Sequence, residues 1–442
     1  MDYVLIKNGK IVDGTNVLEK DLLIGNNKIL AIEDNLERPE PETPVIDAGG
    51  KYLMPGALDI NISFFDACSQ EPESQRKFNQ AEIVGGTTTV LETIVPGLSD
   101  DSSLELLKQK KRPLNVVPDY GFHLSLQGWD RFDEKELDYC YSHEGITSFF
   151  LQWPLDDEGE IANLIELIKT AAQFDLLLMV EMDAPFDASN SSLKKSYEYE
   201  QAIKQYLLNL KRILDLSTSA GCKVLLQNIC FREQIEIILL FKETGLVYSE
   251  LMYPFYLGDS ADYKVDKNSV FFGIPLVDTL SLISHEEFWE LIKSDHFFIV
   301  RPSLTLSSEG VVKDSQVHNR PDEYFLIKNF LSVIYTSGVI REKISLMEFV
   351  SIMAERASKL MGLYPKKGVL RTGSDADLII WDPDYERNIY CNFPQELDSK
   401  PISLKLKGRA EFVFVRGLMA YNGEAFSGDY ALGSFLYRSP IQ

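Results

Sequence analysis

The order of apolar and polar positions divides the chain into a β-rich start, a long alternating middle and a β-rich end. At the start, the pattern predicts two short strands, Tyr3–Lys7 and Lys10–Val12, joined by a turn at Asn8-Gly9. A second hairpin is expected around Gly25-Asn26-Asn27, and one more strand follows with a turn at Gly49. The first fifty residues therefore predict a small β meander.

Apolar runs rich in β-branched residues recur through the middle of the chain, as expected for buried parallel strands. They include Ala57–Ile62 and the run "GGTTTVLETIVP" from Gly85 to Pro96. Segments with the apolar spacing of helices separate these runs. The helices expected are Glu160–Ala172, Lys194–Ser219, Arg232–Thr244, His285–Lys293 and Glu342–Met361. Strands that alternate with helices over roughly 300 residues predict the α/β class, here an eight-stranded (β/α)8 TIM barrel.

The end of the chain returns to strand patterns, as in "GSDADLIIWDP" and "ISLKLKGRAEFVFVRGLMAYNG". A β segment at each end of a barrel is most simply explained as one small β sandwich formed by both chain ends. We therefore assign residues 1–54 to the N-terminal part of the sandwich, 55–365 to the barrel and 366–442 to the C-terminal part of the sandwich.

Charge and composition narrow the choice of partners. The 442 residues carry a formal net charge of −23, from 67 acidic and 44 basic residues. Because so negative a surface repels phosphate backbones and anionic lipids, we expect neither nucleic acid nor membrane partners. The five cysteines are scattered and form no C-x-x-C pair, which favours reduced thiols. With no signal-peptide pattern at its start, the chain is expected to be soluble and cytoplasmic.

Several segments carry a resemblance to a known family. In chain order they are "VLIKNGKIVDG", "VIDAGGKYLMPGALD", "GGTTTV", "DYGFHLSL", "LYPKKGVLRTGSDADLIIWDP" and "FVRGLMAYNGE". Together they resemble the dihydropyrimidinase branch of the amidohydrolase superfamily, which includes hydantoinases, dihydroorotases and allantoinases, and the likeness extends from Tyr3 to Arg438. It implies a barrel with a flanking β sandwich, assembled into homo-oligomers (dimers or tetramers). It also implies two divalent metals, usually zinc, bridged by a carbamylated lysine.

The positions that this resemblance assigns to the metal site hold other residue types. Asn61 and Ser63 replace the paired histidines after the first barrel strand, and Phe150 replaces the bridging lysine. The positions of two further histidines and of the base aspartate hold Glu181, Asn228 (or Gln227, one residue earlier) and Ser303. Amides and hydroxyls bind zinc poorly. We therefore predict a chain that has lost the binuclear site and needs no cofactor.

Some residues keep other chemistry open. Glu181 and Asp183 lie two apart on a predicted strand, so their side chains point to one face. With Asp59 they can form a residual acidic site that holds a hard cation or acts as an acid/base couple; we favour a solvated strand end. Cys230 is a candidate nucleophile without a nearby histidine, and a buried thiol is the better interpretation. For His123 we favour a hydrogen-bonded structural role.

Three classes of function remain. The first is a non-catalytic binding or scaffold homologue, similar in logic to the collapsin response mediator proteins. The second is a hydrolase of cyclic amide C–N bonds with altered or single-metal chemistry. The third is a binding protein for a small planar ligand, stacked on Phe64, Phe65, Phe122, Phe150 and Trp153, although core filling explains these aromatic residues better. Because the usual ligands are missing, we favour the first and third classes. Apolar helices near 194–219 and 327–334 favour a homo-oligomer.

Overall fold

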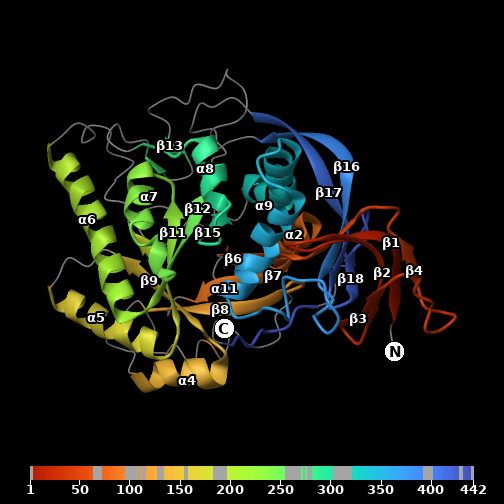
Figure 1. Cartoon of the computed structure of the whole chain (residues 1–442), viewed down its shortest axis with the longest axis horizontal. Coiled ribbons are helices and arrows are strands. Elements are labelled where there is room, and N and C mark those ends of the chain that lie inside the picture. Colours follow the sequence, from red (N-terminus) through yellow and green to blue (C-terminus); the bar gives the residue numbers. More distant parts are fainter. Residues whose placement is uncertain are drawn as a thin grey trace.

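Two large sheets organise the protein in the computed structural model (Figure 1). The structure describes residues 3–62, 72–94, 107, 111, 116–126, 134–153, 158–182, 197–253, 270–271, 274–275, 281–301, 321–391, 402–427 and 432–439. One sheet is a nearly closed parallel barrel, and the other is built from both chain ends. The predicted fold class, a TIM barrel with a β layer from both termini, is therefore confirmed.

The barrel strands follow one another in chain order, each parallel to the next. They are β6 (Ala57–Ile62), β7 (Thr87–Ile94), β8 (Asp119–Ser125), β9 (Ser148–Trp153), β10 (Leu177–Met182), β11 (Lys223–Ile229), β12 (Val247–Met252) and β15 (Phe297–Val300). β8 is buried along its whole length, as expected for a strand covered on both faces. Among the described strands, no backbone ladder joins β15 back to β6.

Helices surround the barrel strands. The described ones are α2 (Pro72–Gly85), α4 (Glu134–Glu144), α5 (Glu158–Gln173), α6 (Tyr197–Ala220), α7 (Arg232–Leu239), α8 (His285–Ile292), α9 (Pro321–Ile334), α10 (Leu346–Val350) and α11 (Arg356–Leu360). α2 and α9 pack together between the barrel and the terminal sheet (Figure 1). None of the helices in the described ranges is long and apolar enough to cross a membrane.

The predicted helices at 160–172, 194–219 and 285–293 are confirmed within one turn at either end, and two others are wrong in extent. The helix expected over Arg232–Thr244 stops at Leu239. A 3-10 turn, Lys242–Thr244, follows, and Gly245 ends this turn by adopting a left-handed conformation (φ 69°). The helix expected over Glu342–Met361 begins at Leu346, because Ser345 and Glu348 form a capping box. A π-helical turn, η6 (Ser351–Glu355), then interrupts it before α11.

The terminal sheet has the order β18-β17-β16-β5-β1-β2-β3, with β4 also paired to β1. Its strands are β1 (Val4–Val12), β2 (Val17–Gly25), β3 (Lys28–Glu33), β4 (Val45–Asp47), β5 (Tyr52–Pro55), β16 (Leu378–Cys391), β17 (Ile402–Val415) and β18 (Leu418–Tyr421). The predicted hairpin between β2 and β3 is confirmed: Asn26 and Asn27 both have positive φ, as a tight two-residue turn requires.

The turn predicted at Asn8-Gly9 is wrong. Asn8 does adopt a positive φ of 56°, but it lies inside one continuous strand, β1, whose register against β2 shifts between Ile6 and Gly9. Such a shift is a β-bulge. The Asn8 backbone N–H donates to the Asp21 carboxylate on β2 (3.1 Å), so the neighbouring strand satisfies the group that the bulge leaves unpaired.

A buried ion network joins the terminal sheet to the barrel. The Lys367 ammonium is almost fully buried and ion-pairs with Asp119 at the start of β8 (2.5 Å), with Asp375 (3.1 Å) and with Asp377. Arg416 also contacts Asp119 (Nε to Oδ1, 3.0 Å). Because Asp119 begins its strand, this network lies at the N-terminal end of the barrel, where side chains serve stability rather than chemistry.

Candidate functional site

The end of the first barrel strand, β6, places Asp59 and Asn61 in a polar environment. The backbone N–H of Asn61 donates to Asp59 Oδ1 (3.1 Å), and the Asn61 side-chain amide donates to Glu250 Oε2 on β12 (3.1 Å). Asn61 therefore connects the first and seventh strands of the barrel. Ser63, the second position of the missing histidine pair, lies outside the described residues.

Glu250 is fully buried at this site. Burial raises the pKa of the Glu250 carboxyl to about 8; the charges of Asp59 and Glu181 add to this increase, and the hydrogen bond from Asn61 opposes it. Its other oxygen, Oε1, has no hydrogen-bond partner among the described residues. Glu250 also lines a cavity of about 30 Å³. The carboxyl is therefore mostly protonated at neutral pH.

Glu181 and Asn228 form a second carboxylate–amide pair. Asn228 lies on β11 at a register shift against β12, with a positive φ of 58°. Its side-chain amide donates to Glu181 Oε1 on β10 (2.7 Å). The two positions that the resemblance assigns to the third and fourth histidines are thus in contact. Asp183, the other predicted member of an acidic pair with Glu181, lies outside the described residues.

Arg301 directly follows the last barrel strand, β15, and its Nη2 contacts two carboxylates. It donates to Glu82 Oε1 on α2 (2.8 Å) and ion-pairs with Asp59 on β6. Burial by itself would lower the pKa of the Arg301 guanidinium. The charges of Asp59 and Glu82 have a larger effect in the opposite direction, so the pKa is raised. Burial also raises the pKa of Glu82, an effect that the Arg301 charge opposes and the Asp59 charge supports.

The structure therefore gives different partners to the two described members of the predicted acidic site. Asp59 is paired with Arg301, and Glu181 is hydrogen-bonded to Asn228. The base-aspartate position, Ser303, lies outside the described residues. Sequence reasoning missed Glu82, Glu250 and Arg301. The one available signal was an arginine closing the apolar run "FFIVR", but basic residues at strand ends are common on protein surfaces.

Phe150, at the bridging-lysine position, is buried in an apolar cluster. The cluster combines Leu58 and Ile60 from β6 with Met179 from β10 and Phe298 from β15. Because these residues come from strands on different sides of the barrel, the cluster fills the barrel interior. The other described aromatic candidates, Phe122 and Trp153, are buried in the larger core, which agrees with core filling; Phe64 and Phe65 lie outside the described residues.

His123 is a buried structural histidine, as expected. Its Nε2 lies 2.9 Å from the carbonyl oxygen of Ile60, and its Nδ1 lies 2.5 Å from Ser148 Oγ. Burial lowers the pKa of His123 well below its ordinary value, and the Arg438 charge adds to the effect. The ring is therefore neutral, with Nε2 donating to the carbonyl and Nδ1 accepting from the Ser148 hydroxyl. Cys230 is also buried, and burial raises the pKa of its thiol.

Within the described ranges, one set of three metal-ligating side chains comes together, Asp119, Asp375 and Asp377. The Lys367 ammonium ion-pairs with all three of them. This set lies at the N-terminal end of the barrel, opposite the strand ends that carry Asn61 and Asn228. It is therefore a structural ion network rather than part of the candidate site.

Comparisons with known proteins find chains of similar sequence and structures of the same fold. The amidohydrolase family profile matches residues 320–419. D-hydantoinase of Geobacillus stearothermophilus is 28% identical over 98% of this chain and 96% of its own length. Human dihydropyrimidinase-related protein 5 is 23% identical over 87% of this chain and 72% of its own length.

Solved structures show the same likeness. A crystal structure of D-hydantoinase covers 100% of both chains with a TM-score of 0.76 and 25% identity. Dihydropyrimidinase from Brevibacillus agri NCHU1002 covers 100% of this chain and 99% of its own with a TM-score of 0.75 and 21% identity. The chain is thus similar over nearly its whole length to hydantoinases and dihydropyrimidinases.

Proposed function

We propose that this chain is a non-catalytic homologue of the hydantoinases and dihydropyrimidinases, and that it acts by binding a protein partner or as a scaffold. The observation that carries the proposal is Phe150. Its ring is 8% exposed and packs in the apolar cluster inside the barrel, at the position that the resemblance assigns to a metal-bridging lysine. A phenyl ring cannot be carbamylated and has no lone pair with which to bridge two cations.

The other described positions also fit a zinc centre poorly. Structural and catalytic zinc is held by imidazole, thiolate or carboxylate groups. Asn61 and Asn228 offer amides, and each amide already donates a hydrogen bond to a glutamate. Glu181 is the one carboxylate among these positions, and it is the acceptor for Asn228. These pairs satisfy one another, which supports a polar network that is stable without metal.

The cavity beside Glu250 and Arg301 is too small to hold a planar ligand. About 30 Å³ beside Glu250 and Arg301 accommodates one or two water molecules. Ligand pockets are typically about ten times larger or more. We further propose a homo-oligomer in the cytoplasm. Leu208 on α6 and Leu240 just after α7 are 59% and 69% exposed, and such apolar side chains support contacts between subunits.

The alternative is a hydrolase of cyclic amide C–N bonds that uses altered or single-metal chemistry, with Asp59, Glu181 and Asp183 as its acidic residues. The observation in its favour is that the carboxylates of Asp59 and Glu181 are close enough to raise the pKa of Glu250. The pairing of Asp59 with Arg301 weighs against it, because a bound cation would have to compete with a buried guanidinium.

Metal content and turnover separate the two functions. We would measure zinc, manganese, iron and magnesium per chain in undialysed protein by elemental mass spectrometry. The same preparation would be assayed on hydantoin and dihydrouracil, with and without added Zn²⁺ or Mn²⁺, beside the Geobacillus stearothermophilus D-hydantoinase as a positive control. The non-catalytic proposal expects far less than one metal per chain and no hydrolysis above the blank. Stoichiometric metal, with turnover that disappears in Glu181→Gln, would establish the alternative.

A further inference from the structure

The barrel has an unusual seam between its first and last strands. A closed barrel pairs these two strands and so leaves no free edge. Here β15 pairs with β12 on one side, and within the described residues no ladder connects its other side to β6. Buried backbone edges need partners or a covering. In the described part of the seam, contacts other than a backbone ladder therefore join β6 and β15.

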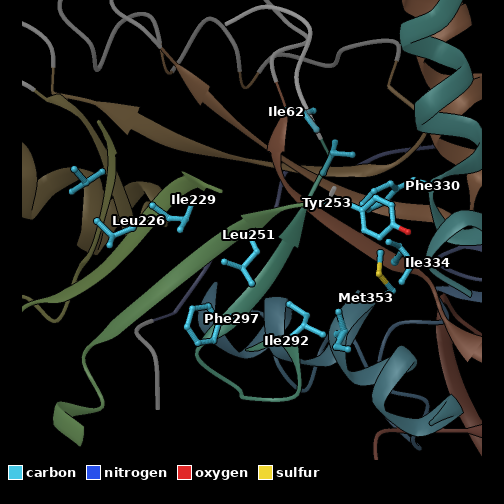
Figure 2. Close-up of a cluster of buried hydrophobic side chains, with 14 of the residues drawn as sticks. Ile62, Leu226, Ile229, Leu251, Tyr253, Ile292, Phe297, Phe330, Ile334 and Met353 are labelled. Carbon is cyan, nitrogen blue, oxygen red and sulfur yellow. The ribbon is translucent and has the colours of Figure 1, made fainter. Parts of the chain in front are cut away.

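Apolar side chains cover the outside of the seam. The π-helical turn η6 contacts both β6 and β15, and its residues Ile352 and Met353 line the cavity between these strands together with Phe330 of α9. Figure 2 shows Phe330, Ile334 and Met353 gathered on one side of the strands, near Tyr253 at the end of β12. Since these contacts are non-directional, they bury apolar surface at the seam but do not set how closely the strands approach.

Arg301 provides the directional contact across the seam. It follows β15, yet its Nη2 contacts Asp59 on β6 and also Glu82 on α2, a helix between β6 and β7. Arg301 and Asp59 are 14% and 16% exposed, and Glu82 is 0% exposed. The second oxygen of Glu82 has no hydrogen-bond partner among the described residues. A buried carboxylate, Glu82, and a partly buried one, Asp59, thus converge on one nitrogen of one guanidinium.

We infer that Arg301 is an electrostatic latch. Asp59 and Glu82 form a guanidinium-binding site, and Arg301, by occupying it, holds the described parts of the first and last barrel strands together. Removing one partner of a buried ion pair leaves the other charges without compensation. Without the guanidinium, the two carboxylates repel each other and recruit water, and the seam opens. This inference does not depend on whether the barrel hydrolyses a substrate.

Hydrogen exchange of the full-length protein, followed by mass spectrometry, tests the latch. In Arg301→Gly, peptides that cover residues 57–62 and 297–301 are expected to exchange about tenfold faster or more, because local opening becomes easier. The matched control is Arg232→Gly. Arg232 makes a bidentate but exposed pair with Glu287 (2.8 and 2.9 Å), so its loss should leave exchange at the seam unchanged. Unchanged seam exchange in Arg301→Gly would overturn the inference.

Chemical rescue separates the latch from a general loss of packing. Low-millimolar guanidinium should restore slow seam exchange in Arg301→Gly, whereas the same concentration of urea or sodium chloride should not. If guanidinium has no effect beyond that of sodium chloride, the carboxylates do not form a guanidinium site and the inference fails. If Arg301→Gly does not fold, Arg301→Gln takes its place. It keeps most of the side-chain volume but removes the charge, so seam exchange should still be faster than in the unaltered protein, and equal exchange would refute the latch.

Discussion

Replacing Glu250 by glutamine should make the free energy of unfolding of the protein less dependent on pH. The carboxyl has an ordinary pKa of 4.5, and burial raises it to about 8 in the folded state. Because the folded pKa is the higher one, the folded protein retains a proton that the unfolded chain releases above pH 4.5. The contribution of this group to stability is therefore complete below about pH 4.5 and is lost as pH rises toward 8.

The size of the effect follows from the two pKa values. Between pH 5 and pH 7 the unfolded carboxyl is mostly ionised and the folded one is mostly protonated, so each pH unit costs about 1.36 kcal/mol. Over this range the folded protein should lose about 2 to 3 kcal/mol of unfolding free energy through Glu250 alone. The glutamine introduced by Glu250→Gln cannot ionise, and its side-chain oxygen can still accept the hydrogen bond from Asn61.

Urea unfolding of the two proteins at pH 5, 6 and 7 measures this difference. The stability of Glu250→Gln relative to the unaltered protein should rise by about 2 to 3 kcal/mol from pH 5 to pH 7. Glu243→Gln, at an exposed position, serves as the control and should show a difference independent of pH. A difference for Glu250→Gln that stays constant across the three pH values would refute the conclusion that this carboxyl is protonated in the folded state.

Three further substitutions test the packing and the ion network. Lys367→Met removes the buried ammonium that Asp119, Asp375 and Asp377 share and should cost about 3 to 5 kcal/mol in urea unfolding, whereas the exposed Lys211→Met should cost less than about 1. Phe150→Ala should cost about 3 to 5 kcal/mol without creating hydrolysis of hydantoin, and a stability equal to that of the unaltered protein would mean that the ring is not packed. Ser345→Ala should cost about 1 kcal/mol of thermal-unfolding stability because the helix loses its cap; no change would show that the cap contributes nothing.

Much of the fold followed from local pattern. The β-branched runs predicted β6 and β7, the helical spacing predicted α5, α6 and α8, and Asn26-Asn27 predicted a tight hairpin. These features depend on short-range preferences of side chains and backbone. Asn8-Gly9 has the same turn chemistry but forms a bulge. A positive φ is compatible with a tight turn and with a bulge. Here β2 pairs with β1 on both sides of Asn8, so the chain continues as one strand and forms a bulge.

For the candidate site, the sequence by itself determined which residue types replace metal ligands: no histidine precedes His123, and Phe150 stands where a bridging lysine is expected. Only the tertiary structure decided what these positions contact. Asn61 hydrogen-bonds to Glu250, which lies 189 residues further along the chain, and Arg301 hydrogen-bonds to Glu82, which lies 219 residues earlier. Contacts at such separations arise when the barrel closes and brings distant strand ends together. They leave no local periodicity in the chain, and so neither the protonated Glu250 nor the Arg301 latch was visible before the fold was known.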